Sequence, residues 1–148
     1  MTFKTLLATV ALTLSIGLPA VPALADGGGH NFVRLDQWGA QNGVGLSQDG
    51  HRNRLSVTQD GTRNTTIATQ DGARNRTAIG QTGSYNSATT SQAGRCNVLG
   101  IAQFGSGNSA DVDQAGRCSA IGIIQTGRGG QVTAQQYGHG NVAVIVQD

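Results

Sequence analysis

The most regularly spaced side chains in this chain are glutamine amides, which can both donate and accept hydrogen bonds. A glutamine recurs at every eleventh position from Gln37 to Gln147, without a change of phase. The series comprises Gln37, Gln48, Gln59, Gln70, Gln81, Gln92, Gln103, Gln114, Gln125, Gln136 and Gln147. A short, rigid period predicts one structural unit copied along an axis, so the chemistry we expect is hydrogen bonding between copies.

Glycine and asparagine follow the same period. A glycine stands two residues after each of the first ten glutamines, at Gly39, Gly50, Gly61, Gly72, Gly83, Gly94, Gly105, Gly116, Gly127 and Gly138. An asparagine stands five residues after eight of them, and Ser119 and Gly130 replace it in two units. The glycines predict turns, because glycine adopts positive φ without steric cost.

Cys96 and Cys118 are the two cysteines of the chain and share one phase of the repeat. If units 22 residues apart stack, their Cα atoms lie about 5 Å apart, within the range of a disulfide. In an oxidising compartment such a bond would contribute about 3 kcal/mol. An intramolecular disulfide, free thiols and intermolecular links are the alternatives, and two cysteines without matching histidines do not predict a zinc site.

The sequence contains no nucleophile elbow, phosphate-binding loop or pair of carboxylates typical of an enzyme. His30, His51 and His139 are isolated and are interpreted as solvated turn residues. We therefore expect no enzymatic activity, no catalytic residue, no cofactor, no bound metal and no interior pocket. A calcium-binding solenoid and an ice-binding solenoid are minor alternatives, because only three units carry Asp-Gly and the outward threonines form no regular array.

Composition argues against nucleic acid as a partner. Charged residues are 12% of the chain, aromatic residues are 4%, and the formal net charge is +2. The basic residues are scattered along the sequence, which is not typical of an electrostatic nucleic-acid footprint.

The first 25 residues have the pattern of a secretory signal peptide. Lys4 precedes an apolar run over residues 6–18, and Ala23 and Ala25 form a small-x-small cleavage site. No other segment is long and apolar enough to span a bilayer, so the mature chain is expected to have no integral membrane segment. The predicted organisation is a signal peptide at 1–25, a short glycine-rich segment at 26–30 and a repeat domain at 31–148.

The period of eleven fits a strand plus a turn. A glycine in every full unit argues against a helix, at a cost of about 1 kcal/mol each. Apolar residues also alternate: between Asn53 and Gln59, Leu55 and Val57 share one face and the intervening residues share the other. This frame predicts eleven strands of seven residues, joined by four-residue turns, from residue 31 to residue 147.

Every predicted strand needs the same inward face, which favours a coil over a hairpin meander. The five residues 92–96 also return unchanged at 114–118, as expected if residues 22 apart stack. The sequence therefore predicts an all-β, two-sheet β-solenoid of 22-residue coils with parallel sheets of odd and even strands. Its amide ladders would bond each side chain to its identical neighbour about 4.8 Å away. They include Asn42, Gln48, Asn53, Gln59, Asn64, Gln70, Asn75, Gln81, Asn86, Gln92, Asn97 and Gln103.

A stack of coils leaves open strand edges at both ends. The last strand carries Val142, Val144 and Val146 outward and no charged residue that would block pairing. These valines mark the predicted polymerisation edge, because end-to-end addition does not close and therefore gives a filament.

The frame of asparagine, two alternating apolar residues, glutamine and glycine, read in coils of 22, resembles the curlin repeat over residues 31–147. Gln48, Gly50, Asn53 and Gln59 match its positions, as do their counterparts in other coils. Curlins are the subunits of curli, the secreted amyloid fibres of bacterial biofilms. The resemblance implies a β-solenoid subunit that polymerises with itself at the surface of a Gram-negative bacterium into pilus-like adhesive fibres.

The same resemblance implies partners: a second curlin subunit, an outer-membrane secretion pore and accessory export proteins. The major subunit of the family usually has a long glycine- and asparagine-rich segment before the repeats, whereas only residues 26–30 stand there in this chain. The paired cysteines are also outside the usual motif. Both the major subunit and a minor, nucleating subunit therefore stay open at this point.

Overall fold

Alternating apolar and polar residues form the strands of this protein, and glycine-containing turns separate them. The structure, a computed structural model, describes residues 29–148, and the predicted signal peptide lies outside them. The strands are β1 (Phe32–Ala40), β2 (Gly43–Gln48), β3 (Arg54–Thr62), β4 (Thr65–Ala73), β5 (Arg76–Ser84), β6 (Ser87–Arg95), β7 (Val98–Ser106), β8 (Ser109–Arg117), β9 (Ala120–Gln125), β10 (Gln131–His139) and β11 (Val142–Gln147).

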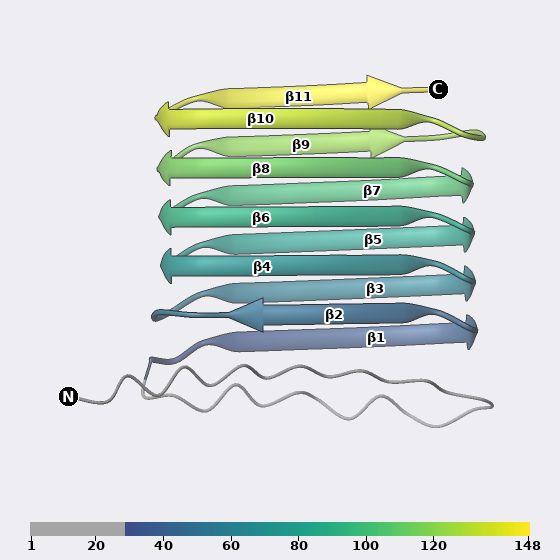
Figure 1. Cartoon of the computed structure of the whole chain (residues 1–148), viewed down its shortest axis with the longest axis horizontal. Helices are drawn as coiled ribbons and strands as arrows, with labels where there is room; N and C mark the ends of the chain where they lie inside the picture. The colour runs from purple at the N-terminus through teal and green to yellow at the C-terminus, as the bar shows by residue number, and fades with distance from the viewer. Residues whose placement is uncertain (1–28) are drawn as a thin grey trace.

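The strands form two parallel sheets that face each other, with successive strands alternating between them (Figure 1). Odd-numbered strands make a six-stranded sheet in the order β1-β3-β5-β7-β9-β11, and even-numbered strands make a five-stranded sheet in the order β10-β8-β6-β4-β2. Residues 22 apart pair, as Gln59 does with Gln81. The predicted all-β, two-sheet solenoid is therefore confirmed. Within residues 29–148, no helix is long and apolar enough to cross a membrane.

Most strands are longer than the sequence predicted, and three are shorter, since β2, β9 and β11 span six residues. Eight of them span nine residues rather than seven. The predicted four-residue turns are wrong for the same reason, since only residues 63 and 64 separate β3 from β4. Gly61 has a φ of 121° yet stays paired with Gly83 of the next coil, so the chain bends without leaving the sheet.

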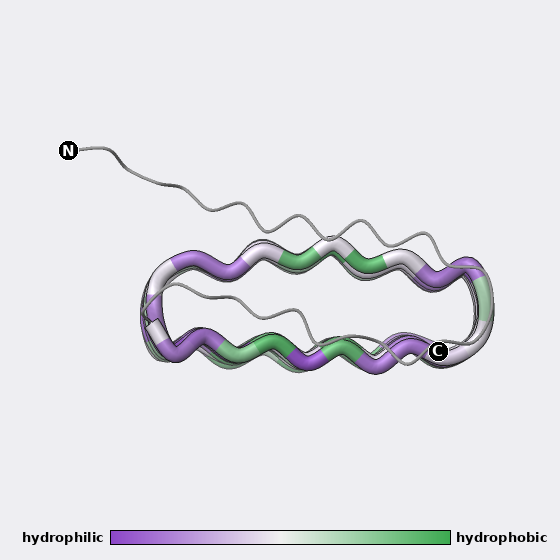
Figure 2. Tube along the Cα trace, turned by 90° about the horizontal axis from the view of Figure 1, so that it is seen from below, coloured by the Kyte–Doolittle hydropathy of each residue, from purple (hydrophilic) through white to green (hydrophobic). Residues whose placement is uncertain are grey.

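The core is a thin apolar layer between the two sheets, which form the long sides of a flattened coil (Figure 2). Its central residues are fully buried, for example Leu55, Val57 and Leu99. The corresponding side chains of the terminal coils are only partly buried: Val33, Leu35, Val44, Leu46, Ala143 and Ile145. Within residues 29–148, each interior rung of the core is thus covered by a rung on both sides, and each terminal rung is covered on one side only.

A second left-handed residue precedes the asparagine position in the turns, and the repeat pattern did not predict it. At this phase Arg63 and Arg74 each have a φ of 57°, and Cys96 has a φ of 63°. Left-handed backbone is uncommon for residues other than glycine. Glycine occupies this phase at Gly107, Gly129 and Gly140, and these three positions were the only hint in the sequence.

Candidate functional site: side-chain ladders and open strand edges

The glutamines form two hydrogen-bonded columns along the solenoid axis. In each column the Nε2 of one glutamine donates to the Oε1 of the glutamine 22 residues later, at 2.6–3.1 Å. The odd-strand column contains Gln37, Gln59, Gln81, Gln103, Gln125 and Gln147, and the even-strand column contains Gln48, Gln70, Gln92, Gln114 and Gln136. The columns have a direction, because every donor points toward the C-terminal end.

Gln81 shows how a buried amide is satisfied. Its side chain is 1% exposed. The Oε1 accepts hydrogen bonds from Gln59 Nε2 at 2.7 Å and Thr66 Oγ1 at 3.0 Å. The Nε2 donates to Gln103 Oε1 at 2.8 Å and to the carbonyl of Thr65, across the coil, at 3.0 Å. The ladder therefore joins consecutive coils and also joins the two sheets, without leaving a costly unpaired group.

The asparagines stack at the same interval but bond to the backbone. Asn75 Nδ2 donates to the carbonyls of Asp71 at 2.8 Å and Gly94 at 3.1 Å, and its Oδ1 accepts from the backbone N–H of Asn97 at 3.1 Å. The prediction of amide-to-amide bonding therefore does not describe the asparagines in general. Among residues 29–148, two asparagine side chains bond to each other in one place only, where Asn86 Nδ2 donates to Asn64 Oδ1 at 3.2 Å.

The shorter asparagine side chain lies at the turn, where backbone groups need partners that the sheet does not supply. The same three contacts recur at Asn53 and Asn97. Asparagine thus closes each turn onto the next, whereas glutamine connects the strands. Sequence spacing alone could not separate these two roles, because both residues stand at the ends of an inward face.

The C-terminal end of the six-stranded sheet is an open edge. Val142, Val144 and Val146 of β11 are 76%, 72% and 65% exposed. The backbone N–H groups of Ala120 and Thr126 donate to the carbonyls of Asn141 and Gln147, so these alternate residues of β11 face β9. Because successive residues of a strand direct their N–H and C=O groups to opposite sides, those of the three valines point away from the solenoid.

The comparisons with known proteins agree with this geometry. The family model described as "Curlin associated repeat" matches residues 30–61 and 61–94. Residues 30–94 are therefore curlin repeats. The matches end at residue 94, and the glutamine column continues through Gln103 and Gln125 to Gln147. No curated protein and no solved structure matches the chain.

A disulfide joins two adjacent coils of the solenoid. Cys96 and Cys118 are bonded, with their Cα atoms 4.5 Å apart and 22 residues between them in sequence. Both occupy the left-handed phase of the turn, where φ is 63° and 50°. The bond lies at the edge formed by the turns after even-numbered strands and leaves the glutamine columns untouched.

We expect the disulfide to stabilise the unassembled chain by about 3 kcal/mol, the value for closing a loop of this size. Replacing both residues, Cys96→Ser with Cys118→Ser, should lower the free energy of unfolding by that amount in urea titrations followed by circular dichroism. The unsubstituted chain under reducing conditions is the matched control. It should unfold at the same lowered urea midpoint as the double variant. Equal midpoints for the oxidised chain and the double variant would contradict the expectation.

The fold gathers basic residues that are far apart in the sequence. Six arginines lie on the edge that holds the disulfide: Arg52, Arg54, Arg74, Arg76, Arg95 and Arg117. Arg54 pairs with Arg76, and Arg95 pairs with Arg117. The interpretation of the basic residues as scattered is therefore wrong in three dimensions. Like charges about 4.8 Å apart repel, so this column opposes the stacking that the amide ladders favour.

Exposed aromatic residues lie at separate places on the surface of the coil and do not form a shared binding site. Tyr85 lies under the guanidinium of Arg63, with the Cζ 5.2 Å from the ring centroid, and its hydroxyl is hydrogen-bonded to the same residue. Tyr137 donates its hydroxyl to Asp113 Oδ2 at 2.6 Å, and this hydrogen bond to a carboxylate raises the pKa of Tyr137. Trp38 and Phe104 are 57% and 50% exposed.

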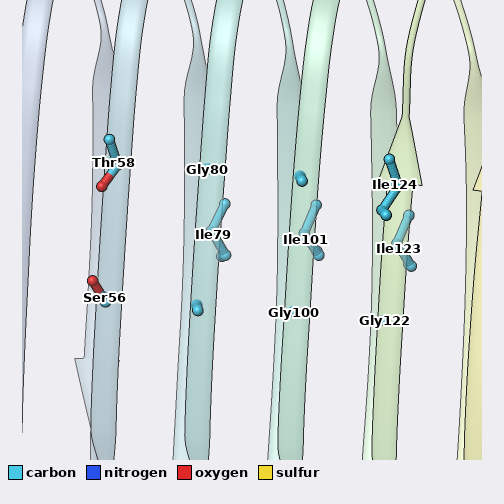
Figure 3. Close-up of a pocket in the computed structure, with 11 residues that line it drawn as sticks. Ser56, Thr58, Ile79, Gly80, Gly100, Ile101, Gly122, Ile123 and Ile124 are labelled. Carbon is cyan, nitrogen blue, oxygen red and sulfur yellow. The ribbon is translucent and has the colours of Figure 1, made fainter.

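A shallow groove crosses the outer face of the six-stranded sheet, where Gly80, Gly100 and Gly122 carry no side chain (Figure 3). This groove lies on the outer surface of the sheet and not between the two sheets. The groove lining contains no acid or base that could activate the hydroxyl groups of Ser56 and Thr58. Among the described residues, no group of three or more metal-ligating side chains occurs.

Proposed function

We propose that this curlin-repeat protein is a structural subunit that assembles end to end into extracellular, amyloid-type fibres. The observation that carries the proposal is the open β11 edge, where three exposed valines direct their backbone groups away from the solenoid. Proteins usually block such edges with charge, proline or a covering segment. Strand β11 contains no charged residue and no proline, so an incoming strand can pair with this edge.

The directional ladders support the same proposal. Every glutamine of a column presents its Nε2 toward the C-terminal end and its Oε1 toward the N-terminal end, as Gln59 does between Gln37 and Gln81. The two ends of the solenoid therefore carry complementary groups rather than identical ones. Contacts between unlike ends are heterologous and do not close, so they generate a filament.

The proposal extends to location and partners through the family. The sequence pattern of residues 1–25 favours export, and the repeat domain 31–148 would then assemble outside the cell. An outer-membrane pore, accessory export proteins and a second curlin subunit are the proposed partners. A role in biofilm matrix and cell adhesion follows from the family and rests on the fibre being formed.

A minor, nucleating subunit is the second candidate. The disulfide and the short segment 26–30 depart from the usual pattern of the major subunit and favour this alternative. A nucleator would accelerate fibre formation by another curlin at substoichiometric amounts while contributing little mass to the fibre. Quantifying this chain in mixed fibres distinguishes the two roles.

The edge is tested by Val144→Pro. Proline removes one of the outward N–H groups of β11, that of residue 144, and leaves the bonds of Asn141 and Gln147 to β9 in place. We expect seeded elongation, followed by thioflavin fluorescence and electron microscopy, to fall at least tenfold. Val144→Thr is the matched control, because threonine keeps both the N–H and the strand propensity, and it should elongate normally.

Normal elongation by the proline variant would place growth elsewhere and contradict the proposed edge. An unsubstituted chain, residues 26–148, that stays monodisperse after dilution from denaturant would contradict the proposed function itself. Fibres with a meridional reflection near 4.8 Å are the expected result for that chain.

A further inference from the structure

The two sheets of the solenoid end at different levels, and this difference constrains how one subunit can follow another. One sheet has six strands and the other has five, so the C-terminal end exposes β11 on the first sheet and β10 on the second. Because strands alternate between sheets, the next strand position after β11 belongs to the sheet of β10 (Figure 1).

We propose that successive subunits in the fibre are related by a half-turn about the solenoid axis. In this junction β1 of the incoming chain pairs with β10, and β2 of the incoming chain pairs with β11. The proposal rests on the proposed fibre function and adds the orientation and register of the partner, a second copy of this chain. The repeat period fixes the register: Gln136 meets Gln37, and Gln147 meets Gln48.

An unpaired buried atom at the N-terminal end supports this register. The Oε1 of Gln48 is buried and has no hydrogen-bond partner among residues 29–148. The next glutamine of its column, Gln70, has an Oε1 that accepts from Gln48 Nε2 at 2.6 Å. Within the described part of the chain, Gln48 therefore lacks the donor that a preceding rung supplies, and a buried acceptor without a donor is costly. In the half-turn junction Gln147 of the preceding subunit provides this donor.

Direct stacking without rotation leaves Gln48 without that donor. It would place β1 of the incoming chain on β11 and β2 two strand spacings, about 10 Å, from β10. One strand position of the five-stranded sheet would then be empty. The glutamine column would be interrupted there, and the core rung formed by Val44 and Leu46 would stay uncovered on one side.

The outward side chains of the two subunits are also more complementary in the half-turn junction than in direct stacking. Arg34 and Asp36 of β1 form an ion pair, with Nε and Oδ2 2.6 Å apart. The half-turn sets this pair beside the polar side chains of β10, which include Thr133 and Gln135, whereas direct stacking sets it beside the valines of β11. The valines instead meet Gly43 and Gly45 of β2, where an added Cβ would contact nothing within 4 Å.

Engineered disulfides distinguish the two junctions. Gly140, Gln41 and His30 share the left-handed phase of Cys96 and Cys118, with φ of 70°, 58° and 54°, so cysteine fits each backbone. In the half-turn junction, residue 140 stacks on residue 41 of the next subunit. In direct stacking it stacks on residue 30, and residue 41 lies at the opposite edge.

The experiment compares Gln41→Cys with Gly140→Cys against the matched control His30→Cys with Gly140→Cys. Both are made with Cys96→Ser and Cys118→Ser, which prevents exchange with the native disulfide. Fibres are grown under reducing conditions, oxidised, dissolved in denaturant with free thiols blocked, and run on a non-reducing gel. We expect a ladder of covalent oligomers from the first variant and only monomers from the control.

A ladder from the His30→Cys variant, or fibres that give no ladder with either pair, would overturn the half-turn junction and leave the proposed function intact. If the serine background does not assemble, helical reconstruction of fibres of the unsubstituted chain decides the question. A rotation near a half-turn per subunit supports the junction, and a translation without rotation overturns it. Failure of the unsubstituted chain to form fibres would remove both proposals.

Discussion

Gly83→Ala lowers the free energy of unfolding by about 3 kcal/mol or more, and the chain forms few or no fibres. Gly83 has a φ of 116°, where alanine is strained, and an added Cβ would lie 2.0 Å from the carbonyl oxygen of Gly105. The clashing atom belongs to the backbone of the next coil, so it cannot move aside without breaking the turn contacts. Left-handed strain of about 1–3 kcal/mol adds to the lost bonds.

Gly80→Ala is the matched control, because Gly80 lies in the same strand, β5, and faces outward. An added Cβ there would meet nothing within 4 Å. We expect its urea midpoint to be unchanged or slightly higher, since alanine reduces the freedom of the unfolded chain. The two variants are compared by urea titration of the unassembled chain and by the yield of sedimented fibre. A Gly83→Ala chain as stable as the control would show that the turn tolerates a side chain.

Gln81→Glu is expected to make assembly depend on pH. The introduced carboxyl is nearly isosteric with the amide and is placed between Gln59 Nε2 and Gln103 Oε1. When protonated, it accepts from Gln59 and donates its O–H to Gln103, so the column stays intact. When ionised, it is a buried charge without a cation and faces the Oε1 of Gln103 with no proton to donate.

Burial raises the pKa of the introduced carboxyl in the folded chain above the unfolded value of about 4.3. The free energy of unfolding of the Gln81→Glu variant is therefore at its highest below about pH 4.3. It falls by about 1.4 kcal/mol per pH unit above that value, until the folded pKa is reached. We expect the variant to be about 3 kcal/mol less stable at pH 7.5 than at pH 4, relative to the unsubstituted chain at the same two pH values. Fibre yield should fall in the same direction.

Gln131→Glu is the control for this substitution, since Gln131 is exposed at the start of β10. Its carboxyl stays hydrated, and we expect no more than about 0.5 kcal/mol of change between the two pH values. A Gln81→Glu chain that is equally stable at both pH values would mean that water reaches the column, and the buried ladder would lose its role in holding the coils together.

Much of this fold could be predicted because the repeat carries its own register. A strand slipped by one residue would turn Leu55, Val57 and their counterparts outward, so the apolar alternation alone selects the pairing. The period of the glutamines, read with the glycines, then gives the coil length. Curlin-type architecture, the two parallel sheets and the apolar layer between them all follow from these local patterns.

The roles of the side chains at the turns could not be predicted in the same way. Glutamine and asparagine carry the same amide, and only the positions of neighbouring backbone groups decide which of them bonds to its own copy. The left-handed residues at Arg63 and Arg74 were missed for a related reason, because their conformation is imposed by the turn and not by their own propensity.

The sequence by itself determined the period, the inward face and the coil, since each depends on residue types at fixed spacing along the chain. Only the tertiary structure decided what lies together along the axis: the column of arginines, the bonded pair Cys96 and Cys118, and the Oε1 of Gln48, which has no partner within residues 29–148. These features depend on contacts between residues a full coil apart, and the closing of the chain into coils is what creates those contacts.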